Sequence, residues 1–179
     1  MQTKIVREIS LASLFIALGL VMPIAFHAFG PGTTFLPMHI PVLIAGFVLS
    51  LPYAICVAII VPILSSFLTG MPVLFPVLPF MIFELLAYAI VANLLYRKFK
   101  MNVYVTLVIS MVAGRIASTL VVWVLVSFFM AKLPAPTVFI VGAISAGIPG
   151  IIIQLIFIPT LVLVLQKTNL LKRSALVKA

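Results

Sequence analysis

The sequence contains almost no acidic residues. It has no aspartate, and Glu8 and Glu84 are its only carboxylates among 179 residues. Proton-driven pumps use chains of carboxylates and histidines within the membrane, and two isolated glutamates do not form such a chain. A Gly-x-x-x-x-Gly-Lys-Ser/Thr loop, which holds the phosphates of a nucleotide, is also missing. The protein is therefore expected to take any energy that it needs from a partner.

Cysteine and histidine are scarce as well. Cys56 is the single cysteine, which excludes a disulfide within the chain and any metal site built from several cysteines. His27 and His39 are the only histidines, and neither stands in a His-Glu-x-x-His motif. The sequence also has no Gly-x-Ser-x-Gly nucleophile motif. We therefore expect no enzymatic activity, no metal site and no cofactor.

Apolar residues are abundant instead. They make up 65% of the chain, and charged residues only 7%, whereas a soluble domain has about 45–50% and about 25%. No residue from Ile9 to Phe83 carries a formal charge, and one bilayer crossing needs only about 20 apolar residues. The composition predicts an all-α integral membrane protein with several crossings.

Proline and glycine clusters divide this apolar sequence into helix-length segments. They include Gly30-Pro31-Gly32 and Gly70-Met71-Pro72. We predict one membrane domain, residues 1–179, with six transmembrane helices, of which the second and third are short. The predicted spans are 6–28, 38–51, 54–69, 77–97, 103–131 and 138–166.

The basic residues support an even number of spans with both termini in the cytoplasm, because cytoplasmic loops collect Lys and Arg. This arrangement leaves Lys132 outside and Arg115 within the membrane. It also explains the net charge of +9 by contact with the lipid bilayer, so that no nucleic acid partner is expected. Nine basic residues then lie on the cytoplasmic side: Lys4, Arg7, Arg97, Lys98, Lys100, Lys167, Lys172, Arg173 and Lys178.

Glu84 and Arg115 are candidate functional residues, because ionisable groups inside a bilayer are costly. A helical rise of about 1.5 Å per residue puts Glu84 about 10 Å below the outer face and Arg115 about 18 Å above the inner face. In a core about 30 Å thick, both lie in the outer half. They form either a structural ion pair or a site for a polar or anionic molecule. Their neighbours in this predicted pocket of the last three helices are Tyr88, Ser118, Thr119 and Ser145.

Other polar and small residues allow more than one interpretation. Trp123 falls near the outer interface, where it belongs either to an aromatic belt or to the pocket wall. Asn93 and Gln154 are expected to form interhelical hydrogen bonds. The spacing of small residues in the run from Gly142 to Gly150 predicts a helix-packing seam.

Three segments carry a resemblance to a known family: Leu36-Pro-Met-His-Ile-Pro-Val-Leu-Ile-Ala-Gly46, Pro62-Ile-Leu-Ser-Ser-Phe-Leu-Thr-Gly-Met-Pro72 and Phe83-Glu-Leu-Leu-Ala-Tyr88. They resemble the substrate-binding (S) components of energy-coupling factor (ECF) vitamin transporters, and the resemblance covers essentially the whole chain. Within the family, the first two segments look most like the pantothenate branch.

The resemblance implies a vitamin receptor in a bacterial plasma membrane, working with a transmembrane coupling subunit and two ATPase subunits. Its site would be covered by the external loops Phe29–Pro37 and Gly70–Pro76, and His39 and Met71 are further candidate substrate contacts. The coupling subunit would dock on a small-residue pair in the first helix, here Ser13 and Ala17. Folate, riboflavin, thiamine or pyridoxine are alternative substrates, and a self-sufficient permease is an alternative function.

Overall fold

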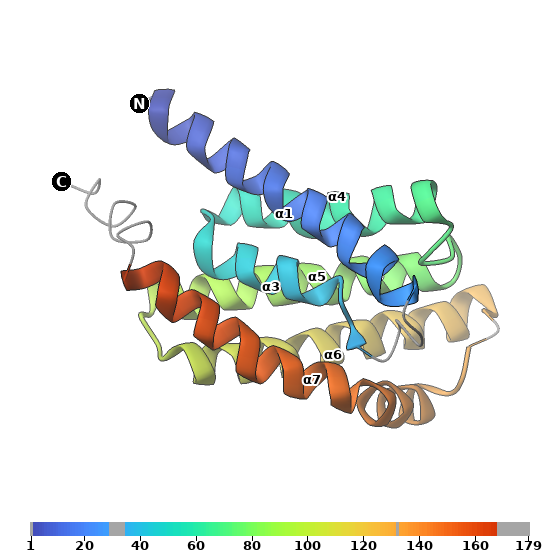
Figure 1. Cartoon of the computed structure of the whole chain (residues 1–179). Helices are drawn as coiled ribbons and strands as arrows, with labels where there is room; N and C mark the ends of the chain where they lie inside the picture. Colours follow the sequence, from blue (N-terminus) through green and yellow to red (C-terminus); the bar gives the residue numbers. More distant parts are fainter. Residues whose placement is uncertain (1, 29–34, 132, 168–179) are drawn as a thin grey trace.

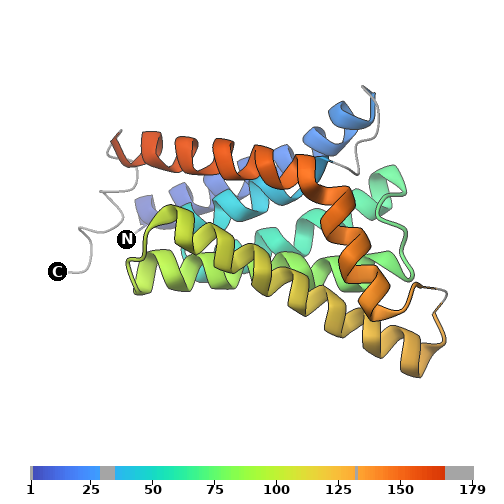
Figure 2. The same cartoon turned by 90° about the horizontal axis from the view of Figure 1, so that it is seen from below.

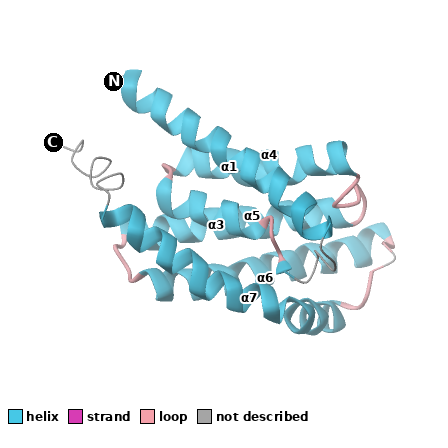
Figure 3. Ribbon diagram, in the orientation of Figure 1, coloured by secondary structure: helices cyan, strands magenta, loops and turns pink. Residues whose placement is uncertain are grey.

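The computed structural model describes residues 2–28, 35–131 and 133–167. These residues form helices and no strand (Figure 3), which confirms the predicted all-α class. The helices are α1 (Gln2–Ala28), α3 (His39–Val48), α4 (Leu51–Thr69), α5 (Val77–Asn93), η1 (Leu94–Lys98), α6 (Val103–Phe129) and α7 (Pro136–Lys167). The predicted positions of residues 29–34, Lys132, Lys172, Arg173 and Lys178 lie outside the described part of the chain.

Five of the helices are long and apolar enough to cross a membrane. They contain Lys4–Phe26, Leu51–Thr69, Val77–Lys98, Val103–Phe129 and Pro136–Leu165. The helix α3 has only 10 residues and is therefore about 15 Å long, half the thickness of a hydrocarbon core. The predicted span 38–51 was thus too long, and α4 begins three residues before the predicted start of the third span.

The helices run roughly alongside one another, with α5 in contact with α3, α4 and α6 (Figure 1). α1 packs on α4 and α3, while α7 packs on α6 and α3. α1 begins and α7 ends at the same end of the bundle, where the α5–α6 connection also lies (Figure 1). We call this the basic end, since it carries Lys4, Arg7, Arg97, Lys98 and Lys100.

The short helix α3 is enclosed by protein. All ten of its residues are buried, and its backbone comes close to α5 at Gly46. A methyl group at Gly46 would lie 3.1 Å from the carbonyl oxygen of Ala89 and 3.1 Å from the side chain of Ala92. Small residues permit this close approach, which lets packing hold two apolar helices together.

Polar side chains at the basic end bind the carbonyl groups at the end of α3. Asn93 Nδ2 donates hydrogen bonds to the carbonyl oxygens of Gly46, at 2.9 Å, and Leu49, at 2.7 Å. Arg97 Nη1 donates to the carbonyl oxygen of Val48 at 3.3 Å. The interhelical hydrogen bonds predicted for Asn93 are thereby confirmed.

Glu8 fixes α1 to the same junction. Its Oε2 accepts hydrogen bonds from the backbone N–H of Ser50, at 2.9 Å, and from the Ser50 hydroxyl, at 3.2 Å. Ser50 caps the start of α4, so the pair joins α1 to the α3–α4 turn. The predicted docking residues Ser13 and Ala17 lie further along α1 and are exposed.

The last helix, α7, is bent in its first half (Figure 2). Pro149 lies inside the helix and cannot donate the usual backbone hydrogen bond, which is a common cause of a bend. The small residues before it do not form the predicted seam at Gly142, where an added methyl group would meet no atom within 4 Å. Gln154 is also buried, and the hydrogen bond predicted for it is not formed by its Nε2, which has no partner in the described part of the chain.

Candidate substrate site

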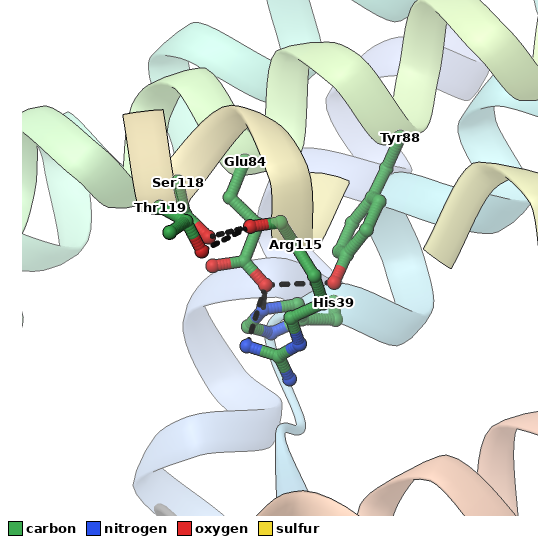
Figure 4. Close-up of polar contacts among 6 residues, drawn as sticks. All are labelled: His39, Glu84, Tyr88, Arg115, Ser118 and Thr119. Carbon is green, nitrogen blue, oxygen red and sulfur yellow. Dashed lines mark hydrogen bonds and ion pairs between the residues drawn. The ribbon is translucent and has the colours of Figure 1, made fainter. Parts of the chain in front are cut away.

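The candidate site is centred on the carboxylate of Glu84. Glu84 Oε1 accepts a hydrogen bond from the Tyr88 hydroxyl at 2.7 Å and lies 2.8 Å from Arg115 Nη1. The same oxygen lies 3.4 Å from His39 Nε2. Figure 4 shows the three side chains converging on this one carboxylate. The structure thus contains the ion pair between Glu84 and Arg115, one of the two alternatives that the sequence left open.

The four side chains come from three helices. Glu84 and Tyr88 lie one turn apart on α5, Arg115 lies on α6, and His39 is the first residue of α3. The rings of His39 and Tyr88 also pack together, with their centroids 5.5 Å apart. Residues distant in the sequence therefore meet because α3, α5 and α6 are packed side by side.

His39 is buried without its usual partners. It is only 2% exposed, and neither of its ring nitrogens has a hydrogen-bond partner among the residues that the structure describes. Its Nε2 therefore lies near the Glu84 carboxylate without hydrogen-bond geometry. A buried polar group normally pairs with protein or ordered water, so His39 has hydrogen-bonding capacity to offer a ligand.

The site has hydrogen-bond donors that Glu84 Oε1 does not use. Arg115 carries five N–H groups, and its contact with Glu84 uses Nη1. Glu84 Oε1 already receives two side-chain donors. Since burying an uncompensated charge is costly, Glu84 stabilises the guanidinium, whose remaining N–H groups can bind an acceptor.

A cavity of about 180 Å³ opens beside these charges. It is lined by Leu36, His39, Phe80, Met81, Glu84, Arg115, Phe139, Ala143, Ala146 and Gly147. Phe80 and Phe139 meet edge to face, with ring centroids 5.1 Å apart. The cavity thus combines a charged wall with aromatic and small apolar walls, and α5, α6 and α7 contribute to it as predicted.

Gly147 brings α7 close to Arg115. A methyl group at this position would lie 3.1 Å from Leu36 Cδ1 and 3.4 Å from Arg115 Nη2. The bend of α7 and the absence of a side chain at Gly147 therefore leave open the part of the cavity next to the guanidinium.

The other predicted site residues have different surroundings. Thr119 donates its hydroxyl to the carbonyl oxygen of Arg115 at 2.7 Å, within α6. Ser145 is exposed and donates to the carbonyl oxygen of Gly142. Trp123 and Met71 are each 53% exposed. None of these four side chains lines the cavity, so their contact with substrate stays a prediction.

Several residues that line the cavity were not predicted from the sequence. Phe80 lies one turn before Glu84, so helical spacing was the available signal for it. Phe139 had no such signal, because the sequence does not distinguish an apolar residue that faces a cavity from one that faces lipid. Among the described residues there is no group of three or more side chains that could hold a metal ion.

The chain was compared with known proteins. The family model for the substrate-specific component of ECF transporters matches residues 7–162. Neither the curated proteins nor the solved structures gave a significant match. The family is a group of membrane transport subunits that bind a small substrate and work with an ECF coupling component and ATPases. Because the family model covers most of the sequence, this chain belongs to the substrate-specific components of ECF transporters.

Proposed function

We propose that this subunit binds pantothenate, or a vitamin of similar size that carries a carboxylate, in the cavity beside Arg115. The surplus of donors carries the proposal. Arg115 and His39 have N–H groups left over, while the near carboxylate oxygen of Glu84 is already occupied. Such a site suits the carboxylate and hydroxyl oxygens of pantothenate through charge-assisted hydrogen bonds.

The size of the cavity supports a small substrate. Its volume of about 180 Å³ is below the range of about 300–1,000 Å³ typical for drug-sized ligands. Folate and riboflavin are large ring systems that would require wider walls. The face contributed by α7 consists of Phe139 and small residues, so the bound molecule would lie between that face and the charges on α5 and α6.

Binding of radiolabelled pantothenate to the purified full chain tests the proposal. Loss of a charge-assisted hydrogen bond of about 1.5–3 kcal/mol predicts that Arg115→Ala weakens binding about 10- to 150-fold. Lys98→Ala removes an exposed charge at the basic end and is the matched control. Since Arg115→Ala also leaves Glu84 unpaired, the double variant Arg115→Ala and Glu84→Ala checks binding without an uncompensated charge.

Equal affinities of the wild type and both Arg115 variants would remove Arg115 from the site. If the wild type does not bind pantothenate, a thermal-shift screen of other vitamins identifies the substrate, because a tight ligand raises apparent stability. Transport is the second test. Proteoliposomes that contain this chain alone should bind substrate and accumulate none, whereas a self-sufficient permease would transport it without coupling and ATPase subunits.

A further inference from the structure

The short helix α3 connects two polar regions of the molecule and lies alongside α5 (Figure 1). Its first residue, His39, lies in the candidate site. The carbonyl groups at its other end lie at the basic end, where side chains of α5 and η1 bind them. Because the rise of a helix is nearly constant, a displacement of α3 along its axis would move His39 within the site by the same amount.

The contacts that fix α3 along its axis are concentrated at the basic end. Asn93 is only 6% exposed, and its Nδ2 donates to the carbonyl oxygens of both Gly46 and Leu49. The ring of Phe47 packs edge to face on the ring of Tyr96, with the centroids 5.0 Å apart. Hydrogen bonds lose strength quickly when their geometry changes, so the bonds of Asn93 resist sliding of α3 past α5.

The end of α3 in the site is held differently. Neither ring nitrogen of His39 has a hydrogen-bond partner among the described residues, and the ring packs on Tyr88 without a hydrogen bond. The His39 backbone N–H donates to the Leu36 carbonyl oxygen at 3.1 Å, a bond within the turn that precedes the helix. Where the His39 ring lies therefore depends on where the rest of α3 is fixed.

A second link joins the same end of α3 to α1. Ser50 follows the last residues of α3, and its N–H and hydroxyl both donate to Glu8 Oε2, at 2.9 Å and 3.2 Å. Glu8 is 8% exposed, so its carboxylate is buried where α1 meets the α3–α4 turn. The end of α3 is thus held from two sides, by α5 through Asn93 and by α1 through Glu8.

We propose that Asn93 is a positioning residue for substrate binding. By holding α3 at the basic end, it sets how the His39 ring lies beside Glu84 and Arg115 (Figure 4). Asn93 does not line the cavity, so its effect on the substrate passes through α3. The inference rests on the proposed function in one respect, namely that the substrate contacts His39.

A double-mutant cycle on the purified full chain tests this role. Equilibrium binding of radiolabelled pantothenate is measured for the wild type, Asn93→Leu, His39→Ala and the double variant. His39→Ala should weaken binding about 10- to 150-fold, the loss of one hydrogen bond to a charged group. Asn93→Leu should weaken binding at least about 5-fold when His39 is present and less than about 2-fold when it is absent. An unchanged affinity of Asn93→Leu, or an equal loss in both backgrounds, would overturn the proposal.

The number of binding sites separates this effect from a loss of stability. Unfolded chains lower the number of sites per protein, but they do not change the dissociation constant of the folded chains. Val122→Ala is the matched control, because Val122 is buried and lies outside the core cluster that contains α3. A loss of affinity in Val122→Ala equal to that in Asn93→Leu would also overturn the role. If Asn93→Leu does not fold, Asn93→Ala takes its place, since water can then reach the two carbonyl groups.

A second measurement does not depend on the substrate. His27 is the only other histidine, so a His27→Gln background leaves one isotope-labelled imidazole, that of His39. Its nuclear magnetic resonance signal should shift in Asn93→Leu and stay in place in Val122→Ala. If the wild type does not bind pantothenate, the proposed substrate is wrong, and this signal alone decides whether Asn93 positions His39. An unshifted signal in Asn93→Leu would overturn the role.

Discussion

Gly114 is the position where one added methyl group should disturb the site most directly. Gly114 lies on α6 next to Arg115, and a methyl group there would overlap the ring of Tyr88. The Tyr88 side chain is buried and is held by its hydrogen bond to Glu84 at 2.7 Å. The ring can therefore make room only by straining the packing of α5 against α6 or by giving up this bond.

Both responses have a known cost. Overpacking a dense interior costs about 1–3 kcal/mol, and a hydrogen bond to a charged group contributes about 1.5–3 kcal/mol. The protein will adopt the less costly of the two responses, so the costs do not add. Gly114→Ala should therefore lower the free energy of unfolding by about 1–3 kcal/mol.

A double-mutant cycle isolates this effect. Unfolding of the detergent-solubilised chain by sodium dodecyl sulfate, followed by circular dichroism, gives the free energies. Gly114→Ala is compared in the wild type and in a Tyr88→Ala background, where the ring is gone and the new methyl group has space. The coupling energy should reach at least about 1 kcal/mol. Gly142→Ala, where an added methyl group meets open space, is the matched control.

An equal cost of Gly114→Ala in both backgrounds would refute the reasoning, since the loss would then have nothing to do with Tyr88. Tyr88→Phe adds a second check, because it keeps the ring and removes only the hydroxyl. Combined with Gly114→Ala, it should retain the steric cost but not the loss of the hydrogen bond to Glu84.

Two further substitutions test the cavity wall and the end of α3. Gly147→Ala should weaken binding of the substrate about 5- to 150-fold, the equivalent of about 1–3 kcal/mol of overpacking. The reason is that its methyl group would press on Leu36 and on the Arg115 guanidinium. Equilibrium binding measures the effect, and an affinity equal to that of Gly142→Ala would contradict it. Asn93→Leu should lower the free energy of unfolding in detergent by about 1–3 kcal/mol, because it leaves buried carbonyl groups of α3 without donors. A loss below about 0.5 kcal/mol would show that water replaces the amide.

The central pair of the site could be predicted from the sequence because it depends on helix geometry. Helical rise is nearly constant, and turn signals mark where the helices of Glu84 and Arg115 begin. The depths of these two residues can therefore be compared from the sequence alone, and the 2.8 Å contact confirms that they agree. The prediction was possible because an ionisable residue in a membrane helix is costly unless it faces the interior of the bundle and is paired.

The apolar half of the cavity could not be predicted in the same way. In a chain with 65% apolar residues, the sides of a helix that face lipid, protein and a cavity have similar compositions. Phe139 lines the cavity while Trp123 is exposed, although both are aromatic residues in predicted membrane helices. Only the packing of α7 on α6 and α3 decides which of them borders the site.

The length of α3 shows why counting spans by hydropathy reaches a limit in this protein. A helix of 10 residues is too short to bring the backbone groups at both of its ends to water across a full hydrocarbon core. Lipid does not tolerate such ends, but protein can satisfy them. Asn93 and Arg97 bind the carbonyl groups at one end, and the other end begins at His39, beside Glu84 and Arg115. Asn93 and Arg97 thus satisfy one end of a short helix that lies inside an apolar protein, and the first residue of that helix lies in the candidate site.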